Sequence, residues 1–409
     1  MNEKNSEENI KNLSPFKHPY LRTFFINEKA LPWTESELRD FDRALLAYDK
    51  SLIGVDVEKG LINRNELLVS YAISKAENSS LTLLEAKELR QQLINNPDFN
   101  CLKEKLKTKK KLSRKDYEEL EFLNIIKVFR KYTKQRLSLG DFTPTLILNI
   151  QAELTAGLDL FNNFLPNLDV YKSGRWRDNN QIRVATFTPA PYEQILSGVE
   201  ELLKFIKKNS GAVNITIFYG ALYVLHPFCN GNKRVCRILE YLLLQANAYN
   251  EKALYNTSFY YHKHKDRYYK KLLDSLLQRN LNQFSSFLLE ALVYSIAGVI
   301  KTSLEIKKRE LLKQFALDEE VEKILHPLIK RSEVQFNRLW ALNKRRPSKQ
   351  TFSNYLGRAV DIGVIQKREA GRNVYYSLSG NWPESEILQN LVQSAIKRVI
   401  YLPEEFRSV

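Results

Sequence analysis

The sequence predicts a mainly helical protein with one small β-hairpin near its middle and a compact module of helices and strands near its C-terminus. Only 14 of the 409 residues are Gly and 13 are Pro, which argues against turn-rich all-β architectures. Long stretches carry apolar residues at three- and four-residue spacing, the period of an amphipathic helix. Hydrophobic residues make up 44% of the chain and charged residues 27%, so the chain can bury a core and is not wholly disordered.

The first predicted domain, residues 1–135, is helical. Residues 36–129 contain almost no glycine, and their charges recur at helical spacing. Ser80 is expected to cap a helix over residues 81–95, because its hydroxyl accepts a hydrogen bond from an N–H of the first turn. One or two further helices are predicted over residues 102–132.

The second predicted domain, residues 136–306, is helical except for a break at residues 171–191. Within the break, residues 181–187 alternate like a strand. The triplet Asp178-Asn179-Asn180 supplies turn chemistry before this strand, and two prolines end it. The segment therefore predicts a hairpin inside an otherwise helical domain.

The third predicted domain, residues 307–409, contains two short helices followed by a hairpin. Ser348 caps the second of these helices and Gly363 ends it. This order resembles a winged helix-turn-helix, a module that binds double-stranded DNA or another protein. On DNA, the second helix would face a groove and the hairpin would lie near phosphates. The residues expected to make these contacts are Lys349, Gln350, Ser353, Arg368 and Arg372.

Charge and cysteine content indicate the surroundings of the protein. The 63 Lys and Arg residues exceed the 47 Asp and Glu residues, and the resulting formal charge of +16 suits a polyanionic partner. Three cysteines do not make a disulfide framework, so a reducing compartment is expected. The first residues show no signal peptide, and the longest apolar stretch, residues 287–300, contains Glu290 and is shorter than a membrane helix. These observations predict a cytoplasmic protein without a membrane partner and leave a homodimer open.

The most informative stretch is residues 215–244, where two apolar helices are joined by a short loop. His226-Pro227 ends the first helix, since proline disfavours the helical conformation of the residue before it. Gly231 can take a positive φ in the loop, so several N–H groups can point inward at the start of the second helix. The loop therefore predicts a cradle for an anion.

Three cations strengthen this prediction. Lys233, Arg234 and Arg237 lie in the first turn of the second helix, where the helix dipole is positive. A cation is disfavoured there by roughly 0.3–1 kcal/mol unless an anion compensates it. A bound polyphosphate would supply that anion.

Residues 226–237 read HPFCNGNKRVCR. They resemble HPFx(D/E)GN(G/K)RxxR, the signature of the Fic (or Fido) family of AMP-transferases, and residues 174–184 resemble the flap hairpin of that family. The resemblance implies a helical Fic core and transfer of AMP from ATP to a Ser, Thr or Tyr hydroxyl of a target protein. It assigns His226 as general base and Gly231, Asn232 and Lys233 as a backbone cradle for the phosphates. Arg234 and Arg237 neutralise the pyrophosphate, while the flap residues Gln181, Ile182, Arg183 and Val184 align the target.

The sequence departs from this signature at Asn230, where the family has the acid that holds Mg²⁺. An amide oxygen still ligates Mg²⁺ but brings no negative charge, so metal affinity is expected to fall. One alternative is a weakened protein that senses nucleotide and binds DNA. Another is a Doc-like phosphotransferase, because Lys233 also occurs in that branch, although the presence of Arg237 favours AMP transfer.

Residues 74–78, SKAEN, resemble part of the family's inhibitory motif (S/T)xxxE(G/N). Ile73 stands where the motif has Ser or Thr, so the match is partial. The resemblance implies that Glu77 pairs with Arg237 and denies the γ-phosphate of ATP its site.

Overall fold

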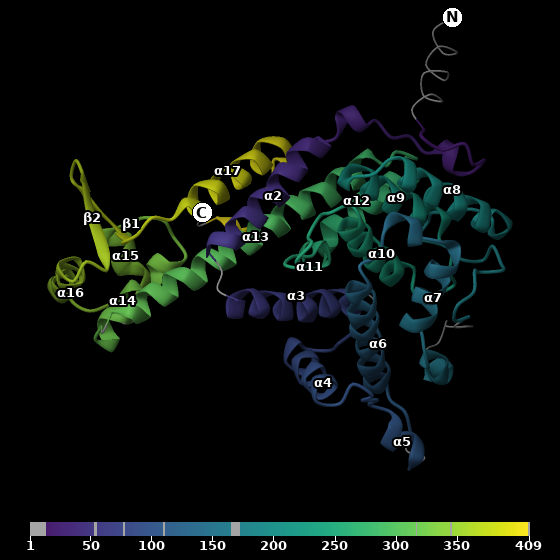
Figure 1. The fold of residues 1–409 in the computed structure, drawn as a ribbon, viewed down its shortest axis with the longest axis horizontal. Coiled ribbons are helices and arrows are strands. Elements are labelled where there is room, and N and C mark those ends of the chain that lie inside the picture. Colours follow the sequence, from purple (N-terminus) through teal and green to yellow (C-terminus); the bar gives the residue numbers. More distant parts are fainter. Residues whose placement is uncertain are drawn as a thin grey trace, which may run out of the picture. The chain divides into compact units, whose positions relative to one another are not determined.

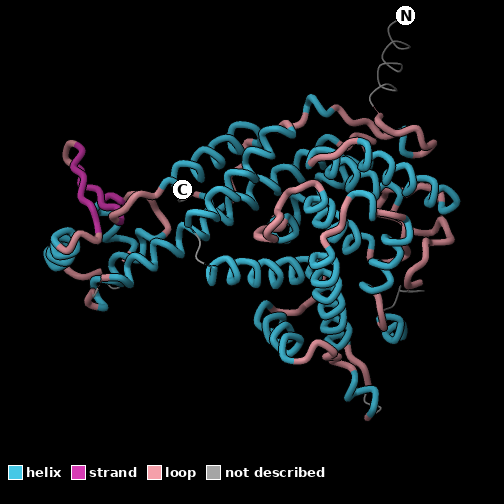
Figure 2. Tube along the Cα trace, viewed as in Figure 1, coloured by secondary structure: helices cyan, strands magenta, loops and turns pink. Residues whose placement is uncertain are grey.

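The computed structural model describes residues 14–52, 55–76, 78–108, 111–164, 172–315, 317–343 and 346–407. Helices dominate these residues, and the named strands form one small sheet (Figures 1 and 2). The prediction of a mainly helical fold is thereby confirmed. The described residues of 1–42 and 54–295 pack into a larger unit, and those of 43–53 and 296–409 into a smaller one. The three domains proposed from the sequence stay a prediction.

Two long helices, α2 (Glu35–Leu52) and α13 (Asn282–Gln314), contribute residues to both units. Short 3-10 helices of the larger unit lie at Leu21–Thr23, Glu28–Ala30, Leu139–Asp141, Leu158–Phe164 and Tyr192–Gln194. Its other α-helices are α3 (Val55–Lys75), α4 (Leu83–Asn95), α5 (Lys103–Lys107), α6 (Arg114–Gln135), α7 (Pro144–Leu154), α8 (Ile195–Lys208), α9 (Ala212–Leu225), α10 (Asn232–Ala246), α11 (Thr257–Lys263) and α12 (Lys265–Leu277).

Helix α4 is capped by Thr82, so the prediction of Ser80 as its cap is wrong. The Thr82 hydroxyl accepts from the Glu85 N–H, and the Glu85 carboxylate accepts from the Thr82 N–H at 2.8 Å. This reciprocal pair satisfies two backbone donors, where a single serine would satisfy one. Ser80 donates instead to the carboxylate of Glu118 on α6, through its hydroxyl at 2.6 Å and its N–H at 2.8 Å.

Helix α9 forms the centre of the larger unit. Every residue of the helix except Asn214 is buried, as expected for a helix that is apolar on all sides. It packs against α8 and α10. Its C-terminal end at Leu225 is consequently held in the core, and the loop that follows starts from a rigid support.

The predicted hairpin is present as a single antiparallel bridge, and residues 181–187 do not form the regular strand expected from their alternation. Val184 and Phe187 exchange two backbone hydrogen bonds of 3.0 Å around a two-residue turn. Ala185 takes a positive φ of 52° in that turn. Only Phe187 of this run is buried, so no neighbouring sheet face enforces the alternating pattern.

Helix α13 is long and apolar enough to cross a membrane by length and composition alone, although the sequence analysis judged its apolar stretch too short. In the structure, 78% of its most apolar window is buried by protein. The Glu290 carboxylate within it accepts hydrogen bonds from Tyr260 and Arg267. Core helices have the same properties, so length and composition are weak evidence for a membrane span.

The smaller unit contains the predicted helix and hairpin order of a winged helix-turn-helix (Figure 1). Its three-stranded antiparallel sheet has the order β1-β3-β2, with Ile365 opposite Leu378 and Ala370 opposite Asn373. The elements are α14 (Glu319–Ile329), β1 (Val334–Gln335), α15 (Phe336–Leu342), α16 (Lys349–Asp361), β2 (Ile365–Ala370), β3 (Asn373–Leu378), α17 (Pro383–Val399) and a 3-10 helix (Glu404–Phe406).

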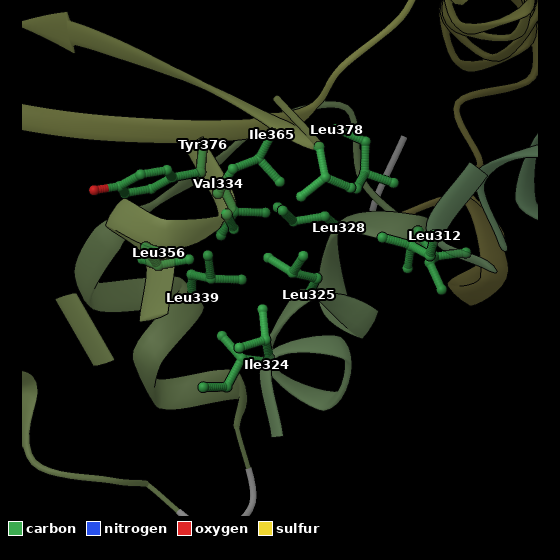
Figure 3. Packing of buried hydrophobic residues seen from close by; sticks show 14 of the residues in the cluster. Leu312, Ile324, Leu325, Leu328, Val334, Leu339, Leu356, Ile365, Tyr376 and Leu378 are labelled. Carbon is green, nitrogen blue, oxygen red and sulfur yellow. The ribbon is translucent and has the colours of Figure 1, made fainter. Parts of the chain in front are cut away.

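The core of the smaller unit lies between its helices and the sheet. Leu328 of α14, Leu339 of α15 and Leu356 of α16 belong to one buried cluster with Val334 and Tyr376 of the sheet (Figure 3). All five side chains are buried. Apolar contact between the helices and the sheet therefore holds α16 in place.

Leu328→Ala should remove about 2–5 kcal/mol from the free energy of unfolding of the smaller unit, because it leaves a cavity at a side chain that is 0% exposed. Urea unfolding of the full chain, followed by circular dichroism, measures this loss. Ile362→Ala is the control, since Ile362 is 52% exposed and its truncation should change stability by less than about 0.5 kcal/mol. Equal losses in the two variants would contradict the packing described.

Candidate active site

The loop between α9 and α10 turns sharply at both ends. His226 follows α9 in the left-handed conformation with φ 47°, and its N–H still donates to the Leu222 carbonyl at 3.0 Å. Gly231 takes φ 84° immediately before α10, as its position in the sequence predicts. The loop thus places a half-buried histidine close to the N-terminus of α10.

The side chain of Asn232 fixes the conformation of this loop. Its Oδ1 accepts from the Phe228 N–H at 3.0 Å, and its Nδ2 donates to the Phe228 carbonyl at 2.7 Å. The Phe228 ring is buried and stacks on Trp176 with centroids 5.1 Å apart. The resemblance assigned only the backbone of Asn232 to the cradle, whereas in the structure its side chain also shapes the loop.

Asn230 is engaged within the loop. Its Oδ1 accepts from the Gly231 N–H at 2.8 Å and from Nη2 of Arg234 at 3.3 Å. Among the described residues, no group of three His, Cys, Asp or Glu side chains could hold a metal ion. The predicted metal ligand Asn230 is therefore not part of such a group in the described chain.

Arg234 forms a buried ion pair with Glu121 of α6. Its Nη1 lies 3.0 Å from Oε1 of Glu121, and the two side chains are 0% and 1% exposed. Removing either partner of such a pair leaves an uncompensated charge in the interior. The pair therefore ties the start of α10 to α6.

Lys233 and Arg237 lie against the C-terminal end of α3. Nη1 of Arg237 donates to the Ala72 carbonyl at 2.9 Å, and Nζ of Lys233 donates to the Ala76 carbonyl at 3.3 Å. The Arg237 guanidinium also faces the Tyr268 ring at 5.3 Å. A helix C-terminus carries partial negative charge, so it complements these cations. Glu77, the predicted inhibitory residue, lies outside the described residues.

The extended segment that carries Gln181, Ile182, Arg183 and Val184 is brought to this loop by Arg177. Nε of Arg177 donates to the His226 carbonyl at 2.8 Å. The four predicted target-aligning residues are exposed or half-buried. Arg177 lies in the predicted flap but was assigned no function from the sequence, where its signal is its position in the GRWR run beside the turn.

The predicted DNA-contacting residues lie on the smaller unit. Lys349, Gln350 and Ser353 are exposed on α16, and Arg372 is exposed in the turn between β2 and β3. Arg368 is paired through two nitrogens with the Glu333 carboxylate, at 2.8 and 2.6 Å. A phosphate would have to compete with this carboxylate for Arg368.

Glu240 lies one helical turn beyond Arg237 in a wholly buried position. Burial raises the pKa of this carboxyl from its ordinary value of 4.5 to about 7, and hydrogen bonds from Tyr261 and Thr257 only partly offset that effect. The pKa of this buried carboxyl therefore lies close to neutral pH.

Comparison with known proteins identifies a domain in this part of the chain. Residues 141–244 match the model of the Fic/DOC family, so the chain carries a Fic/DOC family domain. A Fic family protein from Desulfovibrio desulfuricans G20 is 18% identical, with 86% of this chain and 98% of that chain covered and a TM-score of 0.49. A Fic domain containing signaling protein from Bacteroides thetaiotaomicron VPI-5482 is 14% identical, with coverage of 69% and 99% and a TM-score of 0.47. Fic-1 from C. elegans is 16% identical, with coverage of 65% and 73% and a TM-score of 0.46. None of the curated proteins matches the chain.

The raised pKa of Glu240 predicts a specific pH dependence of stability. Between pH 4.5 and about 7 the unfolded carboxyl loses its proton while the folded one keeps it, so stability falls as pH rises through this window, by at most roughly 3 kcal/mol. Glu240→Gln cannot titrate. Thermal unfolding at about pH 5 and about pH 7.5 should show the variant gaining stability relative to the wild type as pH rises. If the stabilities of the two proteins change equally between these pH values, the raised pKa of Glu240 is contradicted.

Proposed function

We propose that the protein is an adenylyltransferase that moves AMP from ATP onto a Ser, Thr or Tyr hydroxyl of a target protein. The observation that carries the proposal is the placement of His226 at the end of α9, beside the N-terminus of α10, which carries the cations Lys233 and Arg237. The family match over residues 141–244 supports it. We place this activity in the cytoplasm.

In the proposed reaction, the imidazole of His226 accepts the proton of the target hydroxyl. The hydroxyl oxygen then forms a bond to the α-phosphorus of ATP, and the bond from that phosphorus to the bridging oxygen of pyrophosphate breaks. A histidine suits this role because its usual pKa of ~6.5 leaves the ring mostly neutral at pH 7. The proton finally leaves with pyrophosphate or to solvent.

The N–H groups of Asn232 and Lys233 are assigned to the phosphates, because donors at a helix N-terminus stabilise negative charge. The Gly231 N–H is assigned there too, and a phosphate oxygen would have to replace Oδ1 of Asn230 as its acceptor. Lys233 and Arg237 neutralise the leaving pyrophosphate. Since Arg234 is paired with Glu121, we assign it first to holding the loop. Its predicted contact with pyrophosphate stays a prediction, and Mg²⁺ enters with ATP as part of the substrate.

We further propose that the end of α3 restrains the enzyme. The carbonyls of Ala72 and Ala76 already occupy Arg237 and Lys233, the two cations assigned to the phosphates. Glu77 follows directly in the sequence, so a carboxylate there would add to the competition with the γ-phosphate.

Labelling with ATP tests the activity. The purified chain should incorporate label from the α-phosphate and none from the γ-phosphate, and His226→Ala should abolish incorporation because no base remains. Glu77→Gly should raise incorporation roughly tenfold, a usual size for a coupling of this kind. Label from the γ-phosphate alone would favour the Doc-like phosphotransferase.

Asn230→Asp provides an internal control for a chain that takes no label. It introduces the acid found in the family signature. Labelling that appears only in this variant would therefore show that Asn230 is the cause of the missing activity. If the wild type, Glu77→Gly and Asn230→Asp all fail to take label, the adenylyltransferase proposal fails and the nucleotide-sensing alternative gains support.

A second function, binding of double-stranded DNA, is favoured by the winged helix-turn-helix order of the smaller unit and the exposed α16. Duplex affinity should fall steeply with salt, with a slope of about 0.9 for each phosphate contacted. Lys349→Ala with Arg372→Ala should weaken binding to all sequences. Lys208→Ala with Lys270→Ala removes the same charge from exposed positions elsewhere and should leave affinity unchanged; equal losses in both pairs would mean non-specific attraction.

A further inference from the structure

Arg177 is a buried guanidinium beside the candidate catalytic histidine. Its side chain is 3% exposed, although it lies in an irregular segment whose other residues mostly face solvent. No carboxylate within the described part of the chain forms an ion pair with it. Burial lowers the pKa of this guanidinium, because the charged group loses its hydration. Hydrogen bonds to surrounding protein acceptors must replace those it would make with water.

On the side that faces the candidate active site, the Arg177 side chain donates to main-chain carbonyls at the end of α9. Nε of Arg177 donates to the His226 carbonyl at 2.8 Å, and Nη2 donates to the Leu225 carbonyl at 3.2 Å. The Arg177 N–H donates to the Pro227 carbonyl at 2.9 Å. One residue therefore satisfies three consecutive carbonyls where α9 ends, and its positive charge complements the negative end of the helix.

The same guanidinium also holds both ends of the extended segment. Nη1 donates to the Asn179 carbonyl at 2.7 Å, and Nη2 donates to the Ala190 carbonyl. Residues 180–189 form a loop between these two acceptors. Arg177 thus joins the two ends of that loop to the turn at His226.

Two further contacts join the segment around Arg177 to the loop between α9 and α10. Gln151 of α7 accepts from the Gly174 N–H and donates to the Asn230 carbonyl at 3.4 Å. Trp176 stacks on Phe228. Residues 174, 176 and 177 are therefore tied in order to the loop at 230, 228 and 226, which leaves little freedom for one segment to slide past the other.

We propose that Arg177 is a positioning residue that fixes the register between the extended segment and His226, so that a target chain lying along residues 181–184 presents its hydroxyl to the imidazole. This inference rests on the proposed function. A shift of about 1 Å between reacting groups can cost a hundredfold in rate. His226 adopts a left-handed backbone conformation, and the bond from Arg177 to its carbonyl stabilises that conformation.

Arg177→Lys and Arg177→Met test the proposal against the matched control Arg175→Met. Arg175 is two residues away, carries the same charge and is exposed. Lysine keeps the charge but lacks the planar fork that reaches several carbonyls at once. The full chain is compared for amide hydrogen exchange over residues 178–190 and 226–231, for affinity toward a fluorescent ATP analogue, and for the labelling rate at saturating ATP.

For both Arg177 variants we expect at least tenfold faster exchange in the two segments, a labelling rate reduced 10- to 100-fold, and an ATP-analogue affinity within about twofold of the wild type. Arg175→Met should match the wild type in all three. Unchanged exchange, or wild-type labelling by Arg177→Lys, would overturn the proposal, as would an equal loss of nucleotide affinity and labelling.

The exchange measurement does not need an active enzyme, so the two proposals fail separately. A wild type that takes no label overturns the adenylyltransferase proposal, while exchange still shows whether Arg177 fixes the register. If Arg177→Met does not fold, Arg177→Lys and Gln151→Leu supply the same comparison, since Gln151→Leu removes the second tie at a buried position of similar volume.

Discussion

The carbonyl groups at the end of α9 need donors from elsewhere in the chain, because the helix stops at a proline inside the core. Arg177 supplies those donors from a segment that precedes α9 by more than thirty positions in the sequence. These bonds join the turn at His226 to the segment whose Trp176 stacks on Phe228, and the Asn232 amide binds the Phe228 backbone in the same loop. The geometry of the candidate site depends on this satisfaction of the helix end.

The three cations of α10 have chemically different partners. Arg234 is neutralised by Glu121 in the interior, whereas Arg237 and Lys233 donate hydrogen bonds to main-chain carbonyls at the end of α3. A full carboxylate is hard to displace from a buried pair, and a carbonyl is easier to replace by a phosphate. This difference supports the proposal that Arg234 holds the loop while the other two cations bind the phosphates.

The local features of the site could be predicted from the sequence, but the partners of its residues could not. The end of α9 at His226-Pro227 and the positive φ of Gly231 follow from the properties of proline and glycine. The partner of Arg234 lies on α6, far away in the sequence, and no spacing rule points to it. The expected strand over residues 181–187 failed for a related reason: alternation predicts a strand when one whole face is covered, and in this run Phe187 alone is buried.

The buried pair of Arg234 and Glu121 also limits how this sequence can vary. Replacing one partner alone leaves a charge in the interior at a cost of about 3–5 kcal/mol, a large share of the stability of an ordinary domain. Replacing both with apolar side chains of similar volume can be nearly neutral, yet every route of single steps passes through the costly intermediate. Positions 121 and 234 should therefore change together in descendants of this chain, even though they lie on separate helices.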